Sequence, residues 1–179
     1  MLVGGMKLAI NRTPEGPSIE VPIKPQNAIS TTIVLKVKGN IEIVQPEYAQ
    51  KTDGSIDLQP NEAILHGRLQ VEGSGQNENI GFWTDANDWL EWNFKAVKTG
   101  MVRLSADIAS YGSGKFVVSI GNQRNTVIAP NTNSYSAYQT VDLGTFEISQ
   151  IGEVKVVVKS VAEGWQPINL RTIRVRPAN

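Results

Sequence analysis

The chain has no cysteine and no surplus of either charge. Without thiols it can form neither a disulfide nor a thiolate metal site, and cysteine pairing says nothing about its redox compartment. Lysine and arginine number 17 together, as do aspartate and glutamate, and no basic run occurs. Because nucleic-acid binding needs clustered cations for the phosphates, these numbers argue against nucleic acid as a partner.

Long apolar runs are absent as well. No stretch approaches the roughly 20 apolar residues of a membrane-spanning helix, so we expect no membrane partner. Residues 1–6 lack the charged region and the long apolar region of a signal peptide. If the chain is a piece of a longer protein, an export signal would lie on the missing part.

The sequence also lacks the motifs of common enzymes. It contains no Gly-x-Ser-x-Gly, no Walker loop and no histidines at zinc spacing. A glycosidase needs two carboxylates across a cleft, and no motif places such a pair. The single histidine, His66, stands beside Gly67, a position more typical of a structural hydrogen bond than of a ligand. We therefore predict a non-catalytic chain.

Alternation of apolar and polar residues dominates what is present. Residues 102–108 are one example, and polar turns separate eight or so such runs, which predicts an all-β, antiparallel β-sandwich. Gly144 interrupts another run and predicts a bulge or a kink between two short strand pieces. We divide the chain into a short β segment at 1–45, a linker at 46–55 and the sandwich at 56–179. The first segment is too small to bury much apolar area, so it should dock on the rest of the chain, on a second copy as a homodimer, or on a lost neighbouring domain.

Residues 81–94 hold three of the four tryptophans. Leu90, Trp92 and Phe94 alternate with polar residues, so this part should be a half-buried strand with Trp92 in the core. Trp83 and Trp89 border the polar turn at 84–88. Aromatic rings beside Asp and Asn suit sugar binding, because rings stack on pyranoses while amides and carboxylates bind hydroxyls.

Three motifs carry a family resemblance. They are Gly-x-Trp…Asp-Trp-x-x-Trp-x-Phe in 81–94, Thr-Gly-x-x-x-Leu at 99–104 and Gly-Trp-x-x-x-Asn-Leu-x-x-Ile at 164–173. In this order they resemble the galactose-binding-like jelly roll of the family-6 and family-35 carbohydrate-binding modules. More closely, residues 63–94 and 168–171 look like the module appended to bacterial α-L-fucosidase-like enzymes of glycoside hydrolase family 29. Residues 18–39 are similar to the last strands of the sandwich that precedes that module.

The resemblance implies a secreted bacterial module, periplasmic or extracellular, that binds carbohydrate and tethers a catalytic glycoside hydrolase domain absent from this chain. It does not say which sugar is bound. From the resemblance and from the polar turn, the residues expected to contact sugar are Trp83, Asp85, Asn87, Trp89, Trp165 and Asn169. Trp165, in a loop, is the tryptophan that we expect to be most exposed. Each residue also has a purely structural interpretation, since tryptophans in sandwiches are often buried and Asp and Asn in turns often bond their own backbone.

The modules of this family also hold a structural calcium ion between an acid of the first strand and an acid of the last. Glu62 supplies the first, but the last strand reads Asn169-Leu170-Arg171. Because one carboxylate is not a calcium site, we expect no metal and no other cofactor. The alternative function is a structural module that packs on a catalytic domain or on a second copy and has no sugar site.

Overall fold

The structure is a computed structural model that describes residues 7–13, 16–24, 33–34, 38–39 and 48–178. The chain divides into two compact units, Met1–Val44 and Gln45–Asn179. In the first unit, β1 (Ile10–Thr13) pairs with β2 (Gly16–Ile19) as an antiparallel hairpin. The amide of Asn11 donates a 3.0 Å hydrogen bond to Glu20 beside this hairpin.

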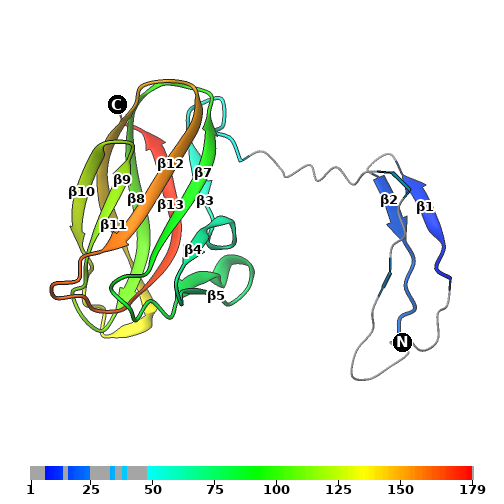
Figure 1. The fold of residues 1–179 in the computed structure, drawn as a ribbon, viewed down its shortest axis with the longest axis horizontal. Helices are drawn as coiled ribbons and strands as arrows, with labels where there is room; N and C mark the ends of the chain where they lie inside the picture. Colours follow the sequence, from blue (N-terminus) through cyan, green and yellow to red (C-terminus); the bar gives the residue numbers. More distant parts are fainter. Residues whose placement is uncertain (1–6, 14–15, 25–32, 35–37, 40–47, 179) are drawn as a thin grey trace. The chain divides into compact units, whose positions relative to one another are not determined.

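The second unit contains two antiparallel sheets (Figure 1). The five-stranded sheet has the order β10 (Gln123–Ile128), β9 (Lys115–Ile120), β12 (Gly152–Ser160), β7 (Trp89–Ala96) and β4 (Ile64–His66). The six-stranded sheet has the order β11 (Ser134–Ile148), β8 (Gly100–Ser110), β13 (Ile168–Pro177), β6 (Asn79–Gly81) and β5 (Gln70–Glu72), and β3 (Ile56–Leu58) also pairs with β13. The predicted all-β, antiparallel sandwich is confirmed.

The described helices are two single 3-10 turns, η1 (Pro60–Glu62) and η2 (Gly75–Asn77). Among the residues that the structure describes, no helix is long and apolar enough to cross a membrane.

The core lies between the two sheets and follows the alternation of the sequence. Along β8, every second side chain from Val102 to Ile108 is at most 4% exposed. Trp92 and Phe94 of β7 are buried in the same core, and the Trp92 indole donates a 2.8 Å hydrogen bond to the carbonyl of Gln59. Trp92 is thus a core residue, as predicted.

Part of the expected linker belongs to the sandwich. Gln50 is only 5% exposed, its amide N–H donates to the carbonyl of Gly54, and its amide oxygen accepts the backbone N–H groups of Val97 and Lys98. The prediction of a linker at 46–55 is therefore wrong for residues 48–55, because a buried amide fixes this segment to the end of β7. Residues 46–47 lie outside the described part of the chain.

Side-chain amides join the outermost strands of the two sheets, β10 and β11. Gln123 both donates to the carbonyl of Glu147, at 2.8 Å, and accepts from its N–H, at 2.7 Å. Asn125 donates to the carbonyl of Leu143 at 2.7 Å. The register of β11 shifts between Asp142 and Gly144, which confirms the predicted bulge. Gly144 has φ +105°, and a Cβ there would lie 2.5 Å from the Asn125 amide nitrogen.

Candidate functional site

Trp83 is fully buried, so its predicted role as a stacking platform is wrong. The indole lies in the core, and its N–H donates a 3.0 Å hydrogen bond to the carbonyl of Asp88. The Asp88 carboxylate in turn accepts the backbone N–H of Arg68 at 2.9 Å. A tryptophan whose ring is buried and whose N–H is satisfied in this way stabilises the loop and offers no face to a ligand.

Trp89 is half-buried and its ring faces are occupied. His66 of β4 and Lys159 of β12 are its cross-strand partners on the two sides of β7. The His66 ring stacks on the indole at 3.6 Å with an interplanar angle of 6°, and Lys159 Nζ lies 4.4 Å from the ring centroid. The Trp89 ring thus has partners from both neighbouring strands, and its contact with sugar stays a prediction.

Trp165 is half-buried against the core, in contrast to its expected exposure. Its ring lies 4.8 Å from that of Trp83 at an angle of 50°, and its N–H donates a 3.2 Å hydrogen bond to the carbonyl of Trp83. The residue therefore fixes the loop between β12 and β13 to the loop between β6 and β7.

Asp85 and Asn87 form a turn. One carboxylate oxygen of Asp85 accepts both the backbone N–H and the side-chain amide of Asn87, each at 2.9 Å. These two bonds lower the pKa of Asp85 below its ordinary value. The pair thus has a structural partner within the turn, and a contact with sugar stays a prediction.

Asn169, at the start of β13, lies in a polar cluster at the same end of the sandwich. Its amide N–H donates a 3.0 Å hydrogen bond to the carbonyl of Tyr135. A Cβ built on Gly81 would lie 3.0 Å from the Asn169 amide oxygen and only 1.9 Å from a carboxylate oxygen of Glu72. That Glu72 oxygen accepts a 3.3 Å hydrogen bond from the amide of Asn79. Asn169 and Glu72 therefore converge over the bare backbone of Gly81.

Exposed tyrosines border this cluster. Tyr111 is 61% exposed and Tyr135 is 40% exposed, and their rings meet edge to face with centroids 4.9 Å apart. Among the described residues, neither hydroxyl has a hydrogen-bond partner. Phe82, directly after Gly81, is 55% exposed with φ +54°, a left-handed conformation that is rare for a bulky residue and typical of functional loops.

We call Glu72, Asn79, Tyr111, Tyr135 and Asn169 the loop-end site. Sequence reasoning found only Asn169 among them. Tyr111 and Tyr135 stand far apart in the sequence, and no local pattern marks them as neighbours. Glu72 carried no local signal, because it meets Asn169 through the pairing of β5 with β6 and of β6 with β13.

Tight contacts hold the loops around the site. The hydroxyl oxygen of Ser110 lies 2.5 Å from the carbonyl of Gly112 and 2.6 Å from that of Pro130. A Cβ on Gly114 would lie 2.2 Å from the backbone oxygen of Gln166, so only glycine permits this approach. The loops before β9, β11 and β13 are thus fixed in position before any ligand binds.

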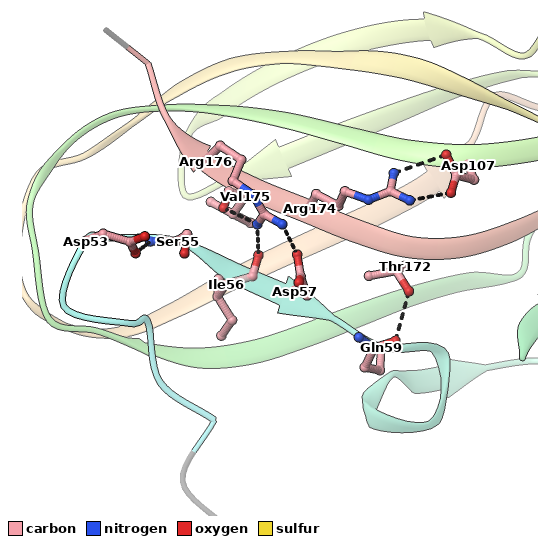
Figure 2. Close-up of polar contacts among 10 residues, drawn as sticks. All are labelled: Asp53, Ser55, Ile56, Asp57, Gln59, Asp107, Thr172, Arg174, Val175 and Arg176. Carbon is pink, nitrogen blue, oxygen red and sulfur yellow. Dashed lines mark hydrogen bonds and ion pairs between the residues drawn. The ribbon is translucent and has the colours of Figure 1, made fainter. Parts of the chain in front are cut away.

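A second polar surface covers the outer face of the six-stranded sheet, where a shallow cavity of about 260 Å³ opens beside β13. Figure 2 shows its ion pairs along β13: Arg176 with Asp57, and Arg174 in a two-pronged contact with Asp107. The Arg174 guanidinium holds the pKa of Asp107 below its usual range. Because these acids already have arginine partners, the surface is explained as a structural network.

The residues present do not fit the calcium ion of the resembling modules. The Glu62 carboxylate accepts the backbone N–H of Gln59 at 2.9 Å and so serves its own 3-10 turn. Arg171 stands where the second acid would be, with its guanidinium 3.7 Å from the Tyr138 ring. In the part of the chain that the structure describes, no three acidic, histidine or cysteine side chains form a group that could hold a metal.

Comparison of the sequence with known families gives one assignment. A family profile described as "Domain of unknown function (DUF5077)" matches residues 69–175, more than half of the chain. The chain belongs to this family. The matched DUF5077 region begins just before β5 and ends within β13, so it includes the whole loop-end site. No curated protein matches the sequence.

Solved structures with the same fold include carbohydrate-binding modules. A family 35 carbohydrate-binding module from Clostridium thermocellum superimposes with a TM-score of 0.59 at 15% identity, over 69% of this chain and 98% of that one. A module from Cellvibrio mixtus lichenase 5A, solved with cellotriose, gives 0.57 at 21% identity over 69% and 98%. The Podospora anserina GH26-CBM35 β-(1,4)-mannanase gives 0.59 at 20% identity over 71% of this chain, which spans only 28% of that enzyme. The fold of the family-6 and family-35 modules, predicted from the sequence, is confirmed.

Proposed function

We propose that the loop-end site binds carbohydrate and that the chain acts as a non-catalytic carbohydrate-binding module. The observation that carries the proposal is the pair of exposed tyrosines, Tyr111 and Tyr135, next to the amide of Asn169 and the carboxylate of Glu72. Exposed phenol rings stack on the apolar faces of sugars, and the neighbouring polar atoms bind hydroxyls. We expect dissociation constants of about tens of micromolar to millimolar, because a small polar ligand buries few atoms.

The structural comparisons support this proposal through the fold alone. The related modules are named for carbohydrate binding, and the module from Cellvibrio mixtus lichenase 5A was solved in complex with cellotriose. In this chain, one end of the sandwich presents the exposed aromatic rings, Tyr111 after β8 and Tyr135 at the start of β11, whereas the sheet face presents ion pairs.

We further propose the wider setting that the resemblance of residues 63–94 implies. In this setting the module belongs to a secreted bacterial protein, outside the cytoplasm, and accompanies a family-29 α-L-fucosidase-like catalytic domain. The β1–β2 hairpin would then pack on such a domain or on a second copy of the chain. Light scattering of the protein alone and with a family-29 catalytic domain tests both arrangements.

The test of sugar binding is calorimetric titration with a panel of monosaccharides and plant and host glycans, including L-fucose and galactose. We expect saturable binding by the unaltered chain and its loss in Tyr135→Ala. Ile151→Ala is the matched control, because Ile151 is an exposed residue (68%) in the turn at the opposite end of the sandwich. A flat response across the panel would contradict sugar binding and favour the structural role. Equal loss in both variants would contradict the assigned site.

A further inference from the structure

Glu72 differs from the aspartates on the six-stranded sheet. Asp57, Asp107 and Asp142 each contact an arginine. Glu72 is half-buried, yet within the described chain its only partner is the neutral amide of Asn79, at the long distance of 3.3 Å. A half-buried carboxylate with no cation beside it keeps acceptor positions that a ligand can use.

The geometry around Glu72 presents hydrogen-bond acceptors. The Asn169 amide is oriented unambiguously, because the group next to its nitrogen is the Tyr135 carbonyl, which can only accept. Its oxygen is therefore directed elsewhere. Because Gly81 has no Cβ, a Glu72 carboxylate oxygen lies against its backbone, 1.9 Å from the ideal Cβ position, and the Asn169 oxygen lies 3.0 Å from the same point. A ligand that contacts these two neighbouring acceptors must supply donors, such as neighbouring hydroxyls or an ammonium group.

We propose that Glu72 makes the loop-end site selective for neutral sugars and amino sugars and against uronic acids. This inference rests on the proposed function and names the ligand class of the same site. A sugar carboxylate at this position would face the uncompensated charge of Glu72, and like charges in contact weaken binding strongly. A hydroxymethyl or amino group would instead donate to Glu72 or Asn169.

The test compares sugars that differ only at carbon 6. The pairs are glucose with glucuronic acid, galactose with galacturonic acid, and mannose with mannuronic acid, and galactosamine is the cationic probe. By calorimetry at low salt, we expect the neutral member of at least one pair to bind about tenfold or more tightly than its uronate, and galactosamine to bind at least as well as galactose. Added salt should reduce the difference in affinity between the neutral sugar and its uronate, because it screens the repulsion between the two carboxylates.

Glu72→Gln keeps the side-chain shape and removes the charge. We expect this variant to bind the neutral sugar within about threefold of the unaltered chain and to bring the uronate to a similar affinity. Glu78→Gln is the matched control, because Glu78 is a half-buried acid in the same connection that lines the sheet-face cavity instead. Glu78→Gln should leave the ratio between the affinities for the neutral sugar and the uronate unchanged.

The outcomes separate this inference from the proposed function. Equal affinity for both members of every pair that binds the unaltered chain overturns the selectivity and leaves sugar binding in place. A ratio of the two affinities that Glu72→Gln does not change does the same. Tighter binding of the uronate overturns it as well. If no member of any pair binds but another sugar of the panel does, only the selectivity is overturned. If the whole panel gives a flat response, both proposals fail.

Discussion

Two aromatic pairs lie at the same end of the sandwich, and they have opposite roles. The rings of Trp83 and Trp165 are 4.8 Å apart, and those of Tyr111 and Tyr135 are 4.9 Å apart. The indoles face the core, and each N–H donates to a backbone carbonyl, whereas the phenols face outward with no partner for their hydroxyls in the described chain. The two pairs therefore differ in whether the polar group of each ring is hydrogen-bonded within the protein. This difference, more than ring size, distinguishes the structural pair from the proposed binding pair.

The largest effect should follow from Trp83→Ala. This change leaves a large cavity in the core and removes a satisfied buried donor, so we expect the free energy of unfolding to fall by about 3–5 kcal/mol. Urea denaturation followed by circular dichroism measures it. A loss below about 1 kcal/mol would mean that the indole is not packed as described, and the comparison of the two pairs would no longer hold.

A smaller effect should follow from Trp165→Phe. The phenyl ring retains part of the contact with Trp83, but the hydrogen bond to its carbonyl is lost. We expect a decrease in unfolding free energy of about 0.5–1.5 kcal/mol, with the affinity for sugar nearly unchanged. A normal stability together with abolished binding would instead assign Trp165 to the ligand, as the sequence suggested.

Lowering the pH should have a still smaller effect on the free energy of unfolding, through the ion pairs of the sheet face. Arg174 lowers the pKa of Asp107 in the folded state, so the pair stabilises the fold above the unfolded pKa of about 3.9. This contribution is lost as the pH falls through the lower, folded pKa. We expect it to be about 1 kcal/mol, because the pair is partly exposed.

The measurement is the difference in unfolding free energy between the unaltered chain and Asp107→Asn as a function of pH. The difference should be present at pH 6 and decrease progressively as the pH falls below the unfolded pKa of about 3.9. A difference that does not depend on pH would show that hydrogen bonds, and not charge, account for the Asp107 contacts.

The smallest effect on stability should follow from changes to the outward pair. Tyr135→Ala should change the free energy of unfolding by no more than about 0.5 kcal/mol, because an exposed ring is removed. The affinity for sugar should nevertheless fall by about tenfold or more. Thermal denaturation and calorimetric titration of one preparation compare the two quantities. A stability loss as large as that of Trp83→Ala would make the tyrosines structural too.

The sequence predicted the elements that depend on local pattern. The alternation of Leu90, Trp92 and Phe94, and that of Val102 to Ile108, indicated strands and their buried faces, and both are observed. The glycine in the run around residue 144 indicated the bulge because a bulged residue often needs a positive φ.

The candidate site was predicted less well, because its residues meet through pairing between distant strands. Periodicity ends where a strand ends, so it could not show that the loop carrying Trp83 turns inward. The partners that cover Trp89 come from β4 and β12, and no local pattern reveals them. Gln50 was assigned to a linker because the sequence around it shows no periodicity. The backbone groups that bind its buried amide lie far along the chain and leave no local pattern.

The amides that join β10 to β11 have a consequence for self-association. The outer edge of a sheet presents unpaired backbone groups, which can recruit a strand of another molecule and begin aggregation. Here Gln123 occupies both the N–H and the carbonyl of Glu147, and Asn125 occupies the carbonyl of Leu143. These side chains of β10 imitate a neighbouring strand, and they withhold the bonded backbone groups of Leu143 and Glu147 from a strand of another molecule.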